Sequence, residues 1–390
     1  MSRMHTKLTL PALVAVALCG APLAQAAECP TRPTWPTTED WPDSRAEVAA
    51  ARPAQIQALE DYAFTLVGKD EERKGIRTDG VVLIHKGRLV YERYARGFDA
   101  SKRHLSWSMS KSFTSALTGI AVKKGAVKLD ESICTYVKAS RKESCAITVR
   151  NLLEFASGLD WREDYENGGT YQTSSVLAML YGEGRKDMVS FITAHELSDK
   201  PGTAWRYSSG DATLLAGVLD GALKPTEGRD WPFTLLLDVL GMKSATWERD
   251  GKGVVVGSSY LHATPRDLAK FGFFYLNDGC WAGQRVLPEG WVADSTQVSG
   301  PIQLKSYERG PGDVQGWQWW LNRRIPGVQD ELPWPHVPDD AYAAEGHWGQ
   351  SISVIPSKDL VVVRMGDDRD GSFSLDTLLK LSLAVVEDLP

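Results

Sequence analysis

The sequence has few cysteines and lacks the cysteine and histidine spacing of a zinc site. Only five of its 390 residues are cysteine and seven are histidine. No CxxC pair occurs, and His195 is followed four residues later by Asp199, where a zinc-peptidase helix needs a second histidine. We therefore expect no metal site.

The chain also lacks a net positive charge. It contains 44 Lys and Arg residues against 50 Asp and Glu residues, which gives a formal net charge of −6. This balance argues against nucleic acid or an anionic membrane surface as a partner. There is no internal repeat, and beyond the first residues no apolar stretch is long enough to cross a membrane. We therefore expect no nucleic-acid partner and no membrane span.

The N-terminus has the three parts of a secretory signal peptide. Arg3 and Lys7 precede an apolar run at residues 8–18, and Ala24-Gln25-Ala26 follows it. The apolar run is too short to span a bilayer comfortably. We expect residues 1–26 to be removed by cleavage before Ala27, and the protein to be periplasmic or secreted.

Four cysteines remain after that cleavage, and in an exported protein an even number suggests disulfide bonds. They are Cys29, Cys134, Cys145 and Cys280. Four cysteines allow three connectivities. Pairing Cys134 with Cys145 closes the shortest loop and would leave Cys29 to pair with Cys280. Unpaired buried thiols are the alternative.

Strand-like segments lie near both ends of the chain. Residues 80–85 and 88–94 are rich in β-forming side chains and are separated by Lys86-Gly87, which predicts a hairpin. The remaining predicted strands are at 316–321, 351–355 and 360–365.

Helical periodicity dominates the middle of the chain. Helices are predicted at 54–66, 108–124, 147–155, 174–181, 187–195, 210–219, 264–276 and, at the end, 375–386. Residues 160–172 have little periodicity and are expected to form a loop.

Together these patterns predict an α+β fold in which an antiparallel sheet, built from both chain ends and flanked by helices, carries an inserted, mostly helical domain. The expected divisions are a loose N-terminal segment at 27–52, an α/β domain at 53–107 and 300–390, and the helical domain at 108–299.

Ser108 and Lys111 form a candidate nucleophile and base. A serine hydroxyl attacks a carbonyl only when a basic group can take its proton. Residues three apart share one face of a helix, so Lys111 can reach Ser108 at the predicted helix start. Two later patches add candidate groups: Tyr207 in a turn before a helix, and residues 345–351, whose glycines allow a backbone to approach a ligand closely.

The ordered patches Ser108-Met109-Ser110-Lys111, Tyr207-Ser208-Ser209 and His347-Trp348-Gly349-Gln350 resemble the three motifs of the serine β-lactamase and penicillin-binding-protein superfamily. The likeness extends over residues 79–365. Within the superfamily, the chain is most similar to class C-like serine hydrolases and esterases, the branch that includes 6-aminohexanoate-dimer hydrolase. The resemblance implies a β-lactamase/transpeptidase-like fold and an esterase or amidase that needs no cofactor.

The resemblance also implies roles for individual residues. Ser108 would form the acyl-enzyme, and Lys111 and Tyr207 would move its proton. The backbone N–H groups of Ser108 and Gln350 would form the oxyanion hole. The implied substrate-binding residues are Tyr165, His347, Trp348, Gly349 and Ser209. Whether Lys111 is neutral, or is an ammonium beside a Tyr207 phenolate, is open at this point.

Two departures from the superfamily pattern bear on the substrate. Ser209 stands where β-lactamases and penicillin-binding proteins have asparagine, and His347-Trp348-Gly349 stands where they have Lys-Thr-Gly. Both changes favour esters or small linear amides over β-lactams. A β-lactamase or D-amino-acid peptidase acting on cell-wall-like substrates is the alternative, and a noncatalytic binding module of the same fold is a second. Glu163 and Asn167 have the spacing of the class A deacylation pair but lie in a different context.

Overall fold

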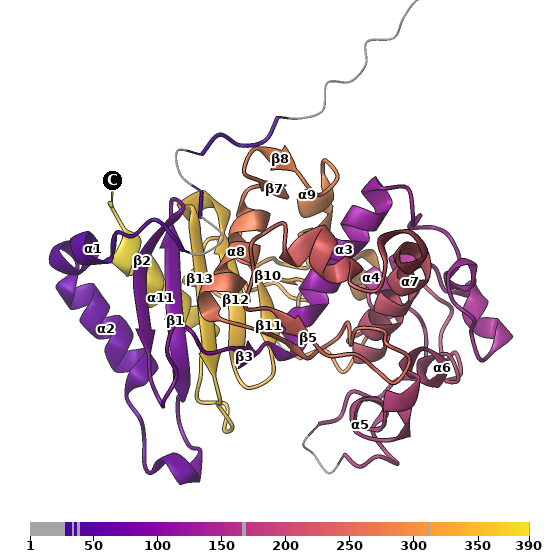
Figure 1. Ribbon diagram of the computed structural model, residues 1–390. Coiled ribbons are helices and arrows are strands. Elements are labelled where there is room, and N and C mark those ends of the chain that lie inside the picture. Colours follow the sequence, from indigo (N-terminus) through magenta and orange to yellow (C-terminus); the bar gives the residue numbers. More distant parts are fainter. Residues whose placement is uncertain (1–27, 33–34, 37–39, 166–168, 311, 390) are drawn as a thin grey trace, which may run out of the picture.

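A six-stranded antiparallel sheet joins the two ends of the chain (Figure 1). The computed structural model describes residues 28–32, 35–36, 40–165, 169–310 and 312–389. The strand order is β10-β11-β12-β13-β1-β2. The strands are β1 (Thr78–His85), β2 (Arg88–Tyr94), β10 (Trp320–Leu321), β11 (Tyr342–Gly346), β12 (Gln350–Ile355) and β13 (Leu360–Gly366). The predicted signal-peptide cleavage site lies outside the described residues.

The predicted hairpin is confirmed, and its turn has the geometry that such hairpins prefer. Lys86 and Gly87 both have positive φ, of 51° and 75°, as a two-residue turn between twisted antiparallel strands requires. β1 then pairs on its other edge with β13, which joins the N-terminal hairpin to the four C-terminal strands of the sheet.

Helices cover both faces of this sheet. Val81 and Leu83 of β1 pack towards α2 (Pro53–Phe64) and α11 (Leu375–Val386), which contact each other. Val82 and Ile84, which point the opposite way, belong to the second core with α8 (Pro265–Leu276). Because both faces are buried, β1 is apolar on successive residues rather than on alternate ones.

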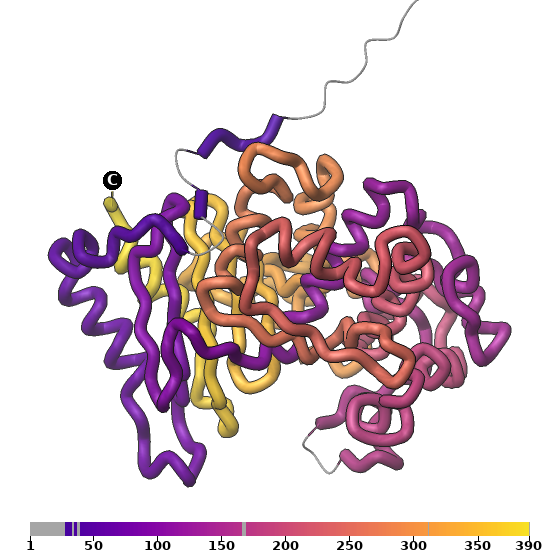
Figure 2. Tube along the Cα trace, in the orientation of Figure 1, coloured from indigo at the N-terminus to yellow at the C-terminus, as the bar shows by residue number. Residues whose placement is uncertain are grey.

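The middle of the chain forms a mostly helical body beside the sheet (Figure 2). The predicted fold class is confirmed. The domain boundaries remain predictions. Helix α8 falls inside the expected 108–299 domain but packs on strands β13 and β12 of the sheet. The helices of the body are α3 (Ser110–Lys123), α4 (Val149–Leu153), α5 (Ser175–Leu180), α6 (Met188–Ile192) and α7 (Ser209–Glu227).

Shorter elements connect these units. The two-stranded and three-stranded pieces are β3 (His104–Leu105), β4 (Trp205–Arg206), β5 (Thr246–Trp247), β6 (Leu261–Ala263), β7 (Cys280–Trp281), β8 (Gln284–Arg285) and β9 (Ser306–Tyr307). The short helical segments are η1 (Asp70–Glu72), η2 (Trp107–Met109), η3 (Ile133–Thr135), η4 (Lys142–Ala146), η5 (Glu183–Lys186), η6 (Phe233–Leu237), α9 (Trp291–Ser295), α10 (Gly300–Leu304) and η7 (Pro356–Lys358). No helix in the described part of the chain is long and apolar enough to cross a membrane.

Two local expectations are corrected by the structure. The strand predicted at 316–321 shortens to β10, because Gln318 has a φ of 64° and a Cβ on Gly316 would lie 2.2 Å from the Ser295 carbonyl oxygen. Trp317 and Trp319 are buried outside any strand, whereas Trp320 remains in β10. The N-terminal segment expected to be loose contains helix α1 (Arg45–Ala51), whose cap Ser44 donates its backbone N–H to the Leu89 carbonyl.

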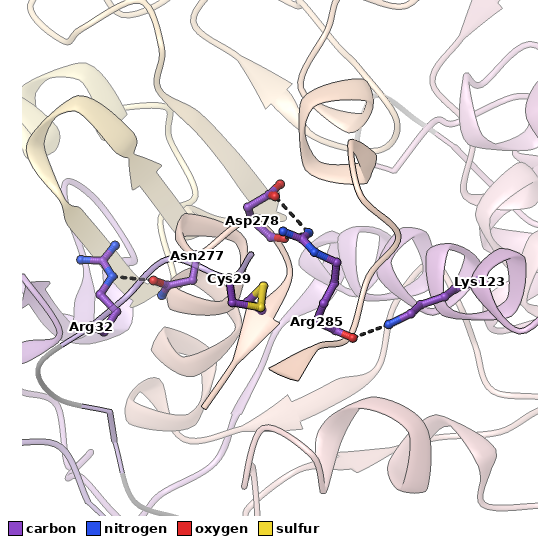
Figure 3. The surroundings of a disulfide bond; sticks show 7 residues. Cys29, Arg32, Lys123, Asn277, Asp278 and Arg285 are labelled. Atoms are coloured by element: carbon purple, nitrogen blue, oxygen red, sulfur yellow. Dashed lines mark hydrogen bonds and ion pairs between the residues drawn. A yellow bond between two sulfur atoms is a disulfide. The ribbon is translucent and has the colours of Figure 1, made fainter. Parts of the chain in front are cut away.

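Two disulfide bonds are present among the described residues. Cys134 pairs with Cys145, and Cys29 pairs with Cys280 across 251 residues of sequence. Figure 3 shows the second bond with its neighbours: Arg32 donates to the Asn277 side chain, and Arg285 pairs with Asp278 at 3.0 Å. The N-terminal segment is thereby attached to β7, the short strand that follows α8.

Candidate active site

Ser108 lies in η2, the single turn that leads directly into α3. The preceding residue, Trp107, has a φ of 49°, and the Ser106 backbone N–H donates to Leu261 of β6 at 2.9 Å. This bend points the chain into the helix and leaves Ser108 half-buried on the wall of a cavity of about 470 Å³. A partly exposed serine at a helix N-terminus is suitably placed to meet a substrate carbonyl.

Lys111 lies one turn further along α3 and is almost completely buried. Its Nζ is 2.9 Å from Ser108 Oγ, 3.1 Å from Ser209 Oγ and 3.1 Å from the Ser258 carbonyl oxygen. Burial lowers the pKa of Lys111 to about 8, and the nearby Glu163 carboxylate opposes this shift. The predicted spacing therefore brings a lysine with an unusually low pKa into contact with Ser108.

Tyr207 completes this group from the turn before α7, whose first residues are capped by the Ser208 side chain. The Lys111 Nζ lies 4.9 Å from the centre of the Tyr207 ring, and an interaction with the Ser108 side chain acts to lower the pKa of Tyr207. Burial, reinforced by the Glu163 carboxylate, raises the pKa of Tyr207 well above its usual range. The phenol is therefore held in its neutral form, while Lys111 is the group able to lose a proton near neutral pH.

A carboxylate that sequence reasoning did not assign to the site lies behind Lys111. Glu163 accepts a hydrogen bond from the Ser209 backbone N–H at 3.0 Å and another from the Ser209 hydroxyl. It also accepts from the Tyr165 hydroxyl at 3.1 Å and from Trp161 Nε1 at 2.5 Å. Ser209 therefore bridges Lys111 to Glu163. Asn167, considered with Glu163 in the sequence, lies outside the described residues.

The turn between β11 and β12 packs directly against η2. A Cβ on Gly346 would lie 2.3 Å from the Ser106 carbonyl oxygen, so only glycine allows these two segments to approach this closely. The Trp107 ring meets His347 and Trp348 edge-on, with centroids 5.8 and 5.3 Å apart. The two segments that carry Ser108 and Gln350 are thus held side by side.

The Gln350 side chain and a buried ion pair brace this turn from behind. Gln350 Nε2 donates to the carbonyl oxygens of His347 and Gly366, at 3.0 and 2.6 Å. Arg364 is fully buried, pairs with Asp368 and donates to the Gly349 carbonyl oxygen at 2.8 Å. Backbone positions at 349 and 350 are therefore fixed by the side chain of Gln350 itself and by Arg364 on the neighbouring strand β13.

The predicted substrate-binding residues fall into two groups. His347 and Tyr165 line the cavity and stack on each other with ring centroids 5.1 Å apart. Trp348 and Gly349 do not line it: Trp348 packs between Trp107 and Arg369, and Gly349 faces Arg364. Ser209 is buried and contacts Lys111 rather than the open cavity.

Sequence and structure comparisons identify the family. Residues 59–384 match the family model described as Beta-lactamase. The chain belongs to the beta-lactamase family. It is a serine hydrolase of this family, as the resemblance of its three motifs implied.

Named relatives of this beta-lactamase-family protein include hydrolases with different substrates. It is 24% identical over 328 residues to 6-aminohexanoate-dimer hydrolase of Paenarthrobacter ureafaciens, covering 81% of this chain and 79% of that protein. The solved structure of EstCE1, a hydrolase with promiscuous acyltransferase activity, has a TM-score of 0.64 at 16% identity, covering 86% of this chain and all of that one. A beta-lactamase/D-alanine carboxypeptidase from Yersinia pestis has a TM-score of 0.61 at 18% identity, covering 88% and 99%.

Proposed function

We propose that this protein hydrolyses esters or small linear amides through an acyl-enzyme on Ser108. The contact of 2.9 Å between Lys111 Nζ and Ser108 Oγ carries the proposal, because it places a base with a lowered pKa against the nucleophile. The relationship to 6-aminohexanoate-dimer hydrolase supports amide substrates, and the fold shared with EstCE1 is compatible with esters.

The lowered pKa of Lys111 supports a neutral amine as the base, and its hydrogen bonds are compatible with that form as well as with an ammonium that donates to all three oxygens. Ser209 donates its hydroxyl proton to Glu163, so its oxygen can only accept from Lys111. The Ser258 carbonyl oxygen also only accepts. A neutral amine has two N–H bonds for these two acceptors and one lone pair, which remains for the Ser108 proton.

Tyr207 then has a separate task. As a neutral phenol it can donate its proton to the leaving group, and it can recover one from the water that attacks the acyl-enzyme. The backbone N–H groups of Ser108 and Gln350 would stabilise the oxyanion, with the Gln350 side-chain bonds and the Arg364–Asp368 pair keeping the second donor in position. No cofactor is needed for these steps.

The experiment combines labelling with turnover. The wild-type protein should react with a fluorophosphonate probe and hydrolyse p-nitrophenyl esters, whereas Ser108→Ala should do neither. Tyr207→Phe and Lys111→Ala should each lower kcat by at least about a hundredfold. Labelling or turnover that survives in Ser108→Ala would rule out this nucleophile, and a wild-type protein inert to both reagents would favour a noncatalytic binding module.

The same assay tests the alternative substrate class. Linear amides, D-alanyl dipeptides and benzylpenicillin should be compared with the esters under identical conditions. Rapid acylation by penicillin, together with weak ester turnover, would favour a β-lactamase or D-amino-acid peptidase.

We further propose that the protein is exported after removal of residues 1–26. Its two disulfide bonds support this, because such bonds persist in oxidising compartments. N-terminal sequencing of protein recovered from the periplasm or medium should find Ala27 first. Recovery of full-length protein in the cytoplasm alone would contradict export.

A further inference from the structure

The cavity beside Ser108 is strongly acidic. Five carboxyl groups line it, and none of the described lining residues is lysine or arginine. The acidic lining residues are Glu163, Asp164, Glu308, Asp313 and Glu345. An anionic substrate would enter this space against repulsion, whereas a cationic one would be attracted.

The excess charge is concentrated away from Lys111. Glu163 already accepts several hydrogen bonds and faces Lys111 through Ser209. Glu345 is different, because within the described residues no hydrogen bond or ion pair reaches its carboxyl group, which lines the cavity. Asp313 accepts one bond, from the Gly310 backbone N–H at 2.7 Å. Burial, with the Asp313 charge, raises the pKa of Glu345 to about 7, and burial also raises the pKa of Asp313.

None of the nearby cationic side chains that the structure describes pairs with Glu345. Lys305 pairs with Asp199 at 2.9 Å, and Arg206 donates to the Trp161 carbonyl oxygen at 2.7 Å. Arg309 donates to the backbone carbonyl oxygens of Asp313 and Val328, at 3.5 and 3.2 Å, and its charge partly opposes the effect of burial on the pKa of Asp313. None of these three lines the cavity. They therefore leave Glu345 without a counter-ion.

Aromatic rings form the wall next to these two carboxyl groups. Trp320 pairs with Ala343 across β10 and β11, so it lies on the same sheet face as Glu345, two residues further along β11. The Trp320 ring stacks on Tyr207 at 5.5 Å, which connects this wall to the reacting group. Aromatic faces beside carboxylates are the chemistry that recognises organic ammonium ions. A metal ion fits less well, since no group of three or more potential ligands in the described part of the chain could hold one.

We propose that the cleft selects substrates carrying an organic cation close to the scissile carbonyl, held by Glu345 and Asp313 against the Trp320 ring. This inference rests on the proposed function and adds a substrate class to it. A quaternary or primary ammonium on a short chain fits this environment. It would take the place of a counter-ion for Glu345 without disturbing the Ser108, Lys111 and Tyr207 contacts.

An isosteric pair of esters isolates the charge. p-Nitrophenyl 4-(trimethylammonio)butanoate and p-nitrophenyl 5,5-dimethylhexanoate differ only in nitrogen against carbon at the branch point, and p-nitrophenyl 4-sulfobutanoate supplies an anion. We expect kcat/KM for the cationic ester to exceed that of its neutral isostere by at least about tenfold, equivalent to one charge-dependent contact of about 1.4 kcal/mol. The anionic ester should be the poorest of the three.

Variants identify the carboxyl groups responsible. Glu345→Gln and Asp313→Asn should each reduce the ratio of cationic to neutral kcat/KM towards one, mainly through KM. Glu71→Gln is the matched control, because it removes one charge from an exposed position on η1 and should preserve the ratio. Equal rates for the two isosteres, or a ratio unaffected by Glu345→Gln and Asp313→Asn, would overturn the inference while leaving ester hydrolysis at Ser108 intact.

A binding measurement keeps the two proposals separable. Calorimetry on the Ser108→Ala variant should detect butyltrimethylammonium binding that is lost when Glu345→Gln is added. No detectable binding would count against the cation site, whatever the hydrolysis assay shows. Failure of the proposed function would instead appear as absent fluorophosphonate labelling of the wild-type protein.

Discussion

The protonation of Lys111 makes a quantitative prediction about the pH dependence of hydrolysis. Lysine ordinarily has a pKa near 10.5, and burial lowers that of Lys111 to about 8. At pH 7 the neutral fraction is then about one tenth, compared with about 0.03% for an unperturbed lysine, a difference of about 300-fold. If neutral Lys111 is the base, kcat/KM for a neutral ester should rise about tenfold per pH unit below pH 8 and level off above it.

Replacing Glu163 by glutamine should move this rise to lower pH. The Glu163 carboxylate favours the ammonium form and so opposes the effect of burial on the pKa of Lys111. Glutamine loses the charge and keeps one of the two side-chain oxygens that accept from Ser209. The midpoint should therefore fall, by about one pH unit for a charge at this range. The pKa of Tyr207 is also raised by Glu163 and should fall in the same direction.

The assay is kcat/KM for p-nitrophenyl butanoate between pH 5.5 and 10, corrected with the Ser108→Ala protein for uncatalysed hydrolysis. The midpoint is the readout, since it is insensitive to a general loss of activity in the variant. Glu345→Gln is the control, because Glu345 lines the same cavity and has a pKa of about 7. If Lys111 sets the midpoint of the profile, removal of the Glu345 carboxyl group should leave that midpoint near pH 8. A flat wild-type profile, or a midpoint that rises in Glu163→Gln, would refute the assignment of neutral Lys111 as the base.

Three further predictions concern the supports of the site. Gly346→Ala should lower kcat by about a hundredfold, because its Cβ would displace the Ser106 backbone. Gly300→Ala is the control, since a Cβ there meets open space, and it should leave kcat unchanged. Steady-state kinetics, with circular dichroism to confirm folding, compares the two variants, and equal activities would contradict the close packing of η2 on β11. Asp368→Asn leaves the Arg364 charge buried and should lower the free energy of unfolding by about 3–5 kcal/mol in urea titration; a loss below about 1 kcal/mol would mean that Arg364 finds another partner. Replacing Cys134 and Cys145 together by serine should lower the free energy of unfolding by about 3 kcal/mol, since the bond closes a loop with a sequence separation of 11. Thermal unfolding measures this loss. An unchanged melting temperature would show that the loop is already ordered without the bond.

Much of this arrangement follows from local patterns in the sequence. The spacing of Ser108 and Lys111 fixes their contact once a helix begins at Ser110. Thr148 and Thr264, residues of a type that favours helix N-caps, cap α4 and α8 inside two of the predicted helical ranges. These features depend only on neighbours within one turn of helix. For the same reason the hairpin at Lys86-Gly87 could be predicted from the residues alone.

The features that could not be predicted depend on contacts between distant segments. Glu163 meets Ser209 across 46 residues, through a loop whose path no periodicity specifies. Residues 316–321 have strand-forming side chains, but the approach of Gly316 to the Ser295 carbonyl oxygen bends the chain there. Trp320, Asp313 and Glu345 come together only when β10 pairs with β11. One signal was present for Glu345, which is the only acid in the otherwise small, aromatic and glycine-rich stretch 341–349, where an acid is costly unless it is used.

The two departures from the superfamily motifs gain a common explanation from this geometry. Where related enzymes place an asparagine, Ser209 here connects Lys111 to a carboxylate, so a negative charge replaces a neutral amide beside the base. Where they place a lysine, His347 stacks on Tyr165, and the nearby Glu345 is acidic. Both changes make the cleft more negative, which disfavours a substrate carboxylate such as that of a penicillin. The charge of the cavity, more than the shared nucleophile, therefore supports the proposed preference for esters or small amides over anionic antibiotics.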